Sequence, residues 1–195
     1  MYDYLTGTIT SKTATGMVVE CNGIGYFTHI SLNTFSRVVE GKVQKIYVHF
    51  TVKEDAHTLY GFADENERRI FRNLISVNGV GPSIARMALS SLAPNELEQA
   101  IVSGDTPVIQ GIKGIGAKSA QRIVIDLKDK MAKSGSASVL ATVSGSDPRQ
   151  EALSALITLG FARPTAEKSV NAAIKKGGNE QGVEELIKSA LGAIG

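Results

Sequence analysis

The chain has 195 residues, enough for one large domain or for two to three small ones. Its 21 basic and 19 acidic residues leave a net charge of +2, so charge alone does not indicate a polyanion partner. A single cysteine, Cys21, excludes an internal disulfide and a thiolate metal cage. The sequence shows no signal-peptide pattern and no apolar run near the ~20 residues of a membrane span, which predicts a cytoplasmic protein without membrane contact.

Residues 1–62 have the pattern of β-structure. Between Ile46 and Val52, apolar residues occupy every second position, as in a half-buried strand. Four further short strands are expected at 2–10, 16–21, 25–31 and 57–62. Asn22-Gly23 predicts a tight hairpin between the second and third of these strands. Five short strands favour a small closed barrel of the OB type, although an SH3-like barrel would give a similar pattern.

Residues 63–133 have the spacing of helices instead. Asp64, with Glu67 three residues later, predicts a capping box at the start of the first helix. Further helices are expected to begin at Pro94 and at Thr106-Pro107, where a proline lies in the first turn. The middle third is therefore predicted to be a compact all-helical domain.

The last third divides into a linker and a small helical domain. Residues 134–146 contain five serines, two glycines and no charged residue, which predicts a flexible linker. Residues 147–195 have three helical stretches, and a three-helix domain of this size is expected to be marginally stable. The predicted fold class is multidomain α+β, with an OB-type barrel, a helical domain, a linker and a three-helix domain.

The helical domain contains an internal repeat. VNGVGPSIA (77–85) aligns with IKGIGAKSA (112–120) at an offset of 35 residues. Each copy has the order helix, Gly-x-Gly turn, helix, which is the pattern of a helix-hairpin-helix motif. Successive N–H groups at the start of the second helix carry partial positive charge, suit a phosphate group and recognise no base sequence. We therefore expect two tandem contacts with the backbone of duplex DNA.

The predicted DNA-binding residues lie in the two turns and in the helix starts that follow them. They are Asn78, Gly79, Val80, Gly81 and Ser83 in the first copy, and Gly114, Ile115, Gly116, Lys118, Ser119 and Arg122 in the second. Lys118 and Arg122 are four residues apart and add positive charge to one helix face, for which a solvated surface is the alternative. A single Gly-x-Gly is more often an ordinary helix end, but two aligned copies favour the DNA-binding interpretation.

No cofactor and no metal are expected. The segment 111–119 resembles a phosphate-binding P-loop, but Ala117 interrupts the motif and no strand precedes it. Neither Gly-x-Gly has the third glycine of a dinucleotide-binding turn. The three histidines all fall in the β-domain without the spacing of a metal site.

With these segments in this order, the chain resembles the RuvA family, which recognises Holliday junctions in the bacterial RuvAB branch-migration complex. The resemblance covers all 195 residues, and its most specific parts are VKEDAHTLYGF (52–62) and the two hairpins. It implies barrels at the centre of a homotetramer, or of an octamer on a junction, with each hairpin pair holding one arm of four-way junction DNA. It also implies an acidic pin that faces the crossover, here Glu54 and Asp55.

The resemblance further implies protein partners. The C-terminal domain, similar to UBA folds, would bind the hexameric AAA+ motor RuvB, which supplies the ATPase activity. The contact residues expected on this domain are Leu159, Phe161, Leu186 and Leu191. A junction resolvase, RuvC or an equivalent, would act on the same DNA.

The function implied is non-catalytic: sequence-independent binding of four-way junctions, which are held open for branch migration in homologous recombination and DNA repair. The sequence departs from the family pattern at two positions. Ser83 stands where a lysine is frequent, and Ala117 stands where the first of two basic residues is frequent. The charge-assisted part of DNA binding is therefore expected to be weaker in this chain.

Three other functions stay open at this point. A base-excision glycosylase has a similar hairpin with a lysine where Lys118 lies, but this chain has Ser136 where such enzymes place a catalytic aspartate, and it has no tryptophan. A junction nuclease needs clustered carboxylates for metal, and Glu54-Asp55 is the only such pair in the barrel segment. In a scaffold protein, the hairpins would contact protein. Binding assays with junction and linear DNA separate these functions.

Overall fold

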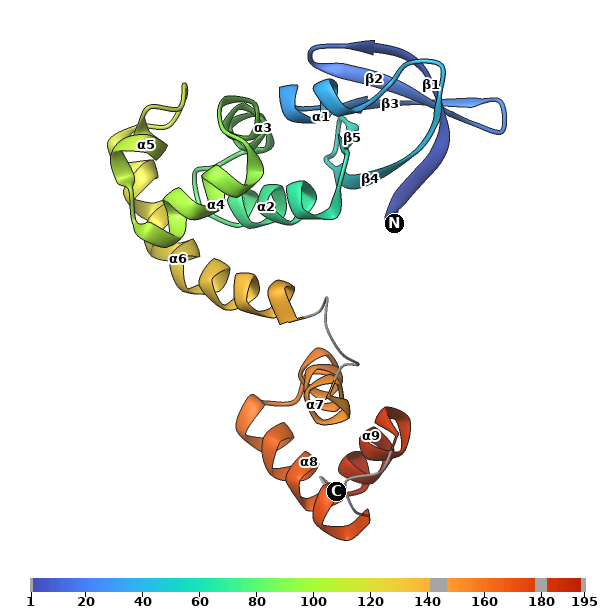
Figure 1. Ribbon diagram of the computed structural model, residues 1–195, viewed down its shortest axis with the longest axis vertical. Helices are drawn as coiled ribbons and strands as arrows, with labels where there is room; N and C mark the ends of the chain where they lie inside the picture. The colour runs from blue at the N-terminus through green and yellow to red at the C-terminus, as the bar shows by residue number, and fades with distance from the viewer. Residues whose placement is uncertain (1, 141–146, 178–181, 194–195) are drawn as a thin grey trace. The chain divides into compact units, whose positions relative to one another are not determined.

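Figure 1 shows a computed structural model of the chain, which describes residues 2–140, 147–177 and 182–193. The chain divides into two compact units, Met1–Gly135 and Ser136–Gly195. The first unit contains both the strands and the hairpin repeat, and the second contains a separate set of helices. None of the described helices combines the length and the apolar character that crossing a membrane requires.

Five strands form a closed barrel. They are β1 (Tyr4–Thr13), β2 (Gly16–Cys21), β3 (Ile24–His29), β4 (Val43–Val52) and β5 (His57–Phe62), arranged in the order β1-β2-β3-β5-β4. β3 runs parallel to β5, with His29 opposite Tyr60, and the other neighbouring strands are antiparallel. This order is the five-stranded Greek-key arrangement of the OB fold, so the structure decides between the two barrel types that the sequence pattern allowed.

The predicted strands are confirmed, with shifted ends and one missed helix. Asn22 and Gly23 both have positive φ, as the predicted hairpin turn requires. The strand expected at 25–31 ends at His29, because Ser31 is the N-cap of a short helix, α1 (Leu32–Arg37). The Ser31 hydroxyl accepts a hydrogen bond from the Thr34 N–H over 3.0 Å. Six residues are too few for helical periodicity to be recognised in the sequence.

The helical part of the first unit contains α2 (Glu65–Ile75), α3 (Pro82–Ser91), α4 (Pro94–Ser103), α5 (Thr106–Gln110) and α6 (Ala117–Leu140). The expected helix starts at Pro94 and Thr106 are confirmed. The capping box at α2 is only half formed. The Asp64 carboxylate accepts from the Glu67 N–H over 2.7 Å, but the Glu67 side chain does not return to Asp64.

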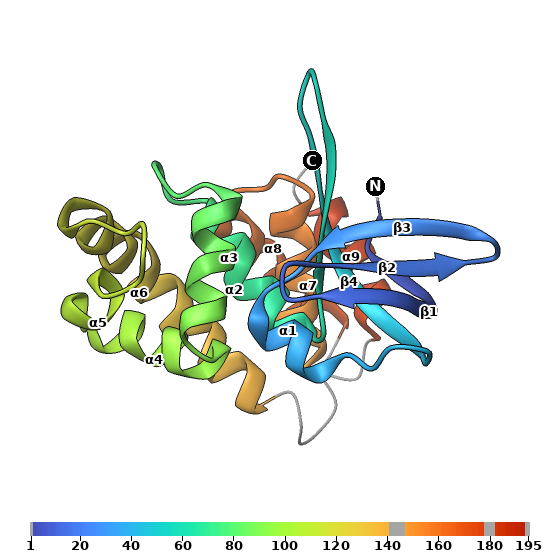
Figure 2. The same ribbon diagram turned by 90° about the horizontal axis from the view of Figure 1, so that it is seen from above.

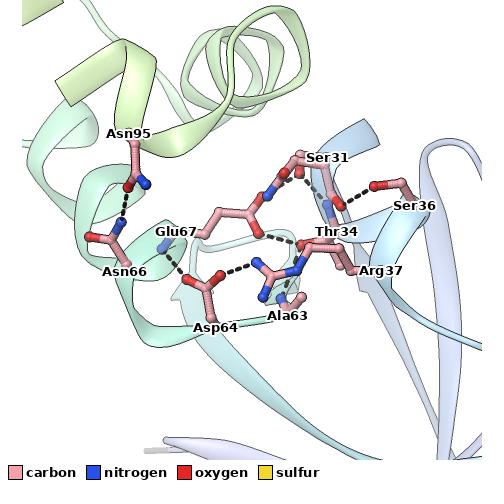
Figure 3. A network of polar contacts seen from close by, with 10 residues as sticks. Ser31, Thr34, Ser36, Arg37, Ala63, Asp64, Asn66, Glu67 and Asn95 are labelled. Atoms are coloured by element: carbon pink, nitrogen blue, oxygen red, sulfur yellow. Dashed lines mark hydrogen bonds and ion pairs between the residues drawn. The ribbon is translucent and has the colours of Figure 1, made fainter. Parts of the chain in front are cut away.

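Glu67 instead joins the barrel to the helices (Figure 3). Its side chain is fully buried, and its two carboxylate oxygens accept hydrogen bonds from the hydroxyls of Ser31 and Thr34, the latter over 2.7 Å. Burial raises the pKa of Glu67, and the two hydroxyl donors oppose that rise. Arg37 of α1 also pairs with Asp64. The helix that leads into the first hairpin is thus fixed to the barrel.

A second contact anchors the same helix. The Arg68 guanidinium is almost completely buried, forms an ion pair of 2.7 Å with Asp3 and donates to the Val48 carbonyl over 3.2 Å. It also pairs with Glu65 one turn earlier on α2. Because an arginine fork can bind several oxygens at once, one side chain connects α2 to both β4 and the N-terminal segment.

Helix α6 extends further than the composition indicates. It continues to Leu140, so residues 134–140 of the expected linker are helical, while 141–146 lie outside the described residues. A helix that is already formed propagates at low cost through alanine, leucine and serine. The linker itself stays a prediction.

The second unit contains α7 (Pro148–Thr158), α8 (Arg163–Gly177) and α9 (Val183–Gly192). Asp147 caps α7, and Gly160, with a φ of 99°, ends the turn that follows it. The three helices enclose a core of small and branched side chains: Ala152, Leu156, Ala166, Val170, Ala173, Leu186 and Ala190. The expected three helices are confirmed.

Candidate nucleic-acid interface

The two predicted hairpins have the same backbone hydrogen bonds. In the first, the Val80 N–H donates to the Val77 carbonyl over 3.0 Å. In the second, the Ile115 N–H donates to the Ile112 carbonyl over 3.0 Å. Each bond closes the turn between two helices, and the partners differ by 35 positions in both cases. The sequence repeat is therefore a repeat of conformation.

The helices that leave the hairpins also begin in the same way. The Ala85 N–H donates to the Gly81 carbonyl over 3.0 Å, and the Ala120 N–H donates to the Gly116 carbonyl over 2.9 Å. Both alanines are fully buried, which lets the two helices of each motif approach closely. Gly81 is the N-cap of α3, and no side chain caps this helix. Its first turn therefore presents N–H groups that suit an anion.

The four hairpin glycines have two different roles. Gly79 and Gly114 have φ values of 90° and 92°, a conformation that side chains oppose. Gly81 and Gly116 lack a positive φ, and a Cβ atom built on either one meets no atom within 4 Å. No contact inside the protein requires a glycine there. The empty space over these two residues is suited to close approach by a ligand.

The predicted site residues divide between surface and core. Val80 and Ile115 are each only 5% exposed, so they can contribute to a DNA contact only through their backbone. Gly81 and Ser119 are half-buried, and the other members of the predicted set are exposed. A buried apolar side chain thus anchors each turn in the core, while neighbouring turn residues are exposed to solvent.

Apolar side chains of both hairpins pack in one hydrophobic core, and one exposed side chain adds a hydrogen bond between the two turns. Arg122 of α6 donates from Nη1 to the Asn78 carbonyl of the first hairpin over 3.3 Å. Lys118, Arg122 and Ile125 line a shallow hollow on the same helix. The structure therefore brings Arg122 of the second motif to the turn of the first motif.

Lys113 is a basic residue that the sequence interpretation missed. It is exposed in the second turn, at the repeat position that corresponds to Asn78. The alignment at an offset of 35 contained this signal, because any role assigned to Asn78 applies to Lys113 as well. The second hairpin thus carries Lys113 and Lys118 where the first carries Asn78 and Ser83.

Glu54 and Asp55 form the two-residue turn between β4 and β5. The Lys53 N–H donates to the Ala56 carbonyl over 2.8 Å and closes this turn, and both acidic residues are exposed. Figure 2 shows the β4–β5 hairpin projecting away from the rest of the barrel. The position fits a protruding pin, and its contact with a DNA crossover stays a prediction.

The predicted partner-binding residues of the second unit differ in their exposure. Leu159 and Leu191 are 62% and 38% exposed, and Phe161 packs partly against the core. Leu186 is only 2% exposed, so its prediction as a surface contact is wrong. It lies on the inner stripe of α9 with Ala190, four residues later. A hollow lined by Leu153, Ile157 and Arg163, among others, lies on α7 and α8.

The three histidines of the barrel pack against aromatic side chains. In the described ranges, no group of three or more histidine, cysteine, aspartate or glutamate side chains could hold a metal ion. His29 accepts at Nδ1 from Arg86 over 3.2 Å, and burial together with this arginine lowers its pKa. Burial also lowers the pKa of His49. Both rings pack against aromatic neighbours, which is a structural role.

Comparison with known proteins agrees with this geometry. Residues 1–61 match the model of the RuvA N-terminal domain, 71–129 match a SAM-like tandem helix-hairpin-helix, and 147–195 match the RuvA C-terminal domain. Relatives from Christiangramia forsetii, Cytophaga hutchinsonii and Flavobacterium psychrophilum are 51%, 45% and 44% identical, and each alignment covers 98% of both chains. Each of these relatives is named a Holliday junction branch migration complex subunit RuvA. The chain therefore belongs to the RuvA family.

Proposed function

We propose that this chain binds four-way DNA junctions through their sugar-phosphate backbones, as a non-catalytic subunit of a branch-migration complex. One observation carries the proposal: two hairpins with the same hydrogen bonds lie next to each other, and each has empty space over a glycine at a helix start. Main-chain donors that meet phosphate oxygens read no sequence, so the interface suits recognition of shape. The names of the relatives support a junction as the target.

The charged part of the contact is concentrated in the second hairpin. Lys113 and Lys118 are both exposed and can each approach one phosphate. The first hairpin depends on its backbone donors and on the N-terminus of α3. We expect few charge-assisted contacts per chain, and therefore a moderate dependence of affinity on salt.

In this proposal, four copies assemble through their barrels, and a second tetramer can complete an octamer on the junction. The barrel supports this assembly because it leaves several large apolar side chains exposed: Tyr4, Ile24, Phe27, Val43 and Val52. Exposed apolar surface of this kind commonly marks protein contacts. Four-fold symmetry would place eight acidic groups from Glu54 and Asp55 around one centre.

The C-terminal unit is proposed to recruit the motor RuvB, a hexameric ATPase, and the junction then becomes accessible to a resolvase such as RuvC. The exposed Leu159 and Leu191 support a protein contact on this unit. The nucleotide chemistry belongs to the motor, and the complex is proposed to act in the cytoplasm during recombination and repair.

The proposal is tested by titrating the full chain with a four-way junction and with a linear duplex of equal length, at one salt concentration. We expect tighter binding to the junction by about tenfold or more. Equal affinity for both DNAs would contradict the proposal, as would ATP hydrolysis or DNA cleavage that copurifies with the chain at constant specific activity.

The acidic pin needs its own test. Carboxylates repel phosphates at short range. We therefore expect the pin to lower the affinity for a continuous duplex that crosses the centre of the tetramer. Replacement of Glu54→Gln together with Asp55→Asn is expected to raise affinity for linear duplex and to narrow the preference for junctions. If the exposed turn has no role beyond solubility, the double variant leaves both affinities unchanged.

A further inference from the structure

Arg122 is exposed, yet its guanidinium is hydrogen-bonded to the protein. It lies in the first turns of α6, the helix that leaves the second hairpin, and its Nη1 donates to the carbonyl of Asn78 over 3.3 Å. The acceptor is a main-chain atom in the turn of the other hairpin, 44 residues earlier in the chain. A single side chain of the second motif is therefore bonded to the backbone of the first.

This bond is not a by-product of the repeat. At an offset of 35, Arg122 aligns with Met87, an exposed residue that cannot donate a hydrogen bond. A reverse hydrogen bond, from α3 of the first motif to the turn of the second, therefore has no side-chain donor at the equivalent position. Lys118 aligns with Ser83 and differs from it in charge as well. Among the described residues, the side-chain hydrogen bond between the hairpins therefore runs from the second motif to the first.

The exit helix of the first motif, α3, is hydrogen-bonded to the barrel in a similar way. Arg86 of α3 donates from Nη1 to the Thr15 carbonyl over 3.1 Å and to Nδ1 of His29 over 3.2 Å. Both acceptors belong to the barrel. Arg86 therefore attaches the first hairpin's exit helix to the barrel, and Arg122 attaches the second hairpin's exit helix to the first hairpin. The two arginines thus add hydrogen bonds between segments that already share one hydrophobic core.

We propose that Arg122 is a positioning residue, which holds the first hairpin in register with the second so that both meet phosphates of one duplex arm. The inference rests on the proposed DNA-binding function and deepens it. The shared core sets the approximate separation of the two sets of N–H donors, and the bond from the guanidinium to the carbonyl restricts it further, so less orientation remains to be fixed when DNA binds. Lys118, one turn earlier on the same helix, is the residue that meets phosphate.

The first test compares Arg122→Gln with Lys118→Gln on four-way junction DNA over a series of salt concentrations. A phosphate contact contributes about 0.9 to the slope of log K against log salt for each chain engaged, so Lys118→Gln is expected to reduce this slope. Arg122→Gln is expected to weaken binding about three- to tenfold, the effect of one hydrogen bond, with the slope unchanged. An equal fall in slope for both variants would overturn the positioning role.

The second test asks through which hairpin Arg122 acts. Gly81→Val blocks the first hairpin without internal strain, because its Cβ direction is empty and its φ is −84°. In that background, Arg122→Gln is expected to have no further effect, while Lys118→Gln keeps its full effect. Additive losses for Arg122→Gln would show that it contacts DNA independently and would overturn the inference.

The same measurements separate failure of this inference from failure of the proposed function. If the unmodified chain does not prefer the junction, or if Lys118→Gln leaves the salt slope unchanged, the DNA-binding proposal itself fails. If both of those results hold and only Arg122→Gln departs from expectation, the positioning role alone is wrong. Thermal unfolding of every variant, measured beside the unmodified chain, identifies losses that come from folding.

Discussion

The two helix-hairpin-helix copies share the same backbone conformation but carry different side chains. Their turns share hydrogen bonds of equal length and share glycines with φ near 90°. The first copy carries Asn78 and Ser83 where the second carries Lys113 and Lys118. Main-chain geometry is thus common to both, while positive charge belongs to the second. Shape recognition and electrostatic attraction are separable properties of this interface, and each can be changed without the other.

The largest expected effect comes from filling the space over the turns. Gly116→Val places a branched side chain where phosphate must approach, so we expect junction affinity to fall about 30- to 100-fold. Gly81→Val in the first copy should have an effect of similar size, because the backbone geometry is the same. Equilibrium titration with junction DNA measures both.

Gly182→Val is the matched control for these variants. Gly182 is also a helix N-cap with ordinary φ and with no atom within 4 Å of a built Cβ, but it lies in the second unit. It should leave DNA affinity unchanged. Normal binding by a folded Gly116→Val protein would be inconsistent with a phosphate contact at this turn.

The other glycine of each turn should act through stability instead. Gly79→Ala and Gly114→Ala force a side chain into a positive-φ conformation, which costs about 1–2 kcal/mol. Gly81→Ala and Gly116→Ala should cost much less, because their backbone needs no such conformation. Denaturant unfolding of the four alanine variants measures the difference. Equal losses at all four positions would contradict the two roles assigned to these glycines.

The first copy is attached to the barrel through a buried carboxyl group, that of Glu67 on α2, which binds Ser31 and Thr34. Because burial raises the pKa of Glu67 in the folded chain, the stability from this group is present below its ordinary value of about 4.5 and is lost as pH rises through the folded pKa. Glu67→Gln removes this loss. We therefore expect the stability of the variant, relative to the unmodified chain, to increase between pH 4.5 and neutrality.

Thermal or denaturant unfolding at several pH values measures this difference. Glu20→Gln, which changes an exposed carboxylate on β2, is the control and should follow the unmodified chain at each pH. A constant difference between Glu67→Gln and the unmodified chain across the pH range would show that Glu67 does not titrate differently in the folded state. The opposite sign would mean that its hydroxyl donors outweigh burial.

The smallest expected effect comes from making the charges of the two copies equal. Ser83→Lys introduces a cation at the position of Lys118 and should raise the slope of log K against log salt by about 0.9 for each chain engaged. Lys113→Gln should lower it by the same amount. Lys128→Gln, ten residues beyond Lys118 on α6, is the matched control. An unchanged slope in Ser83→Lys would show that the first copy meets DNA in a different orientation.

Local chemistry explains why most of the fold was predictable. Several features depend only on residues that are near one another in the sequence. They are the alternation of apolar and polar residues in β4, the Asn22-Gly23 turn, and the prolines at the starts of α4 and α5. The hairpins were predictable because each Gly-x-Gly turn is local in sequence and because the second aligned copy distinguishes it from an ordinary helix end. The short helix α1 was missed because six residues do not establish a period.

The sequence by itself determined the barrel strands, the hairpin repeat and the three helices of the second unit, because each is encoded by neighbours in the chain. Only the tertiary structure decided which partners the charged side chains take. Glu67 was expected to cap its own helix, yet it binds Ser31, 36 residues away, and Arg122 reaches Asn78, 44 residues away. Such pairs form only when packing brings distant segments together, and at Glu67 burial then makes an unpaired carboxyl group costly enough to select its partners.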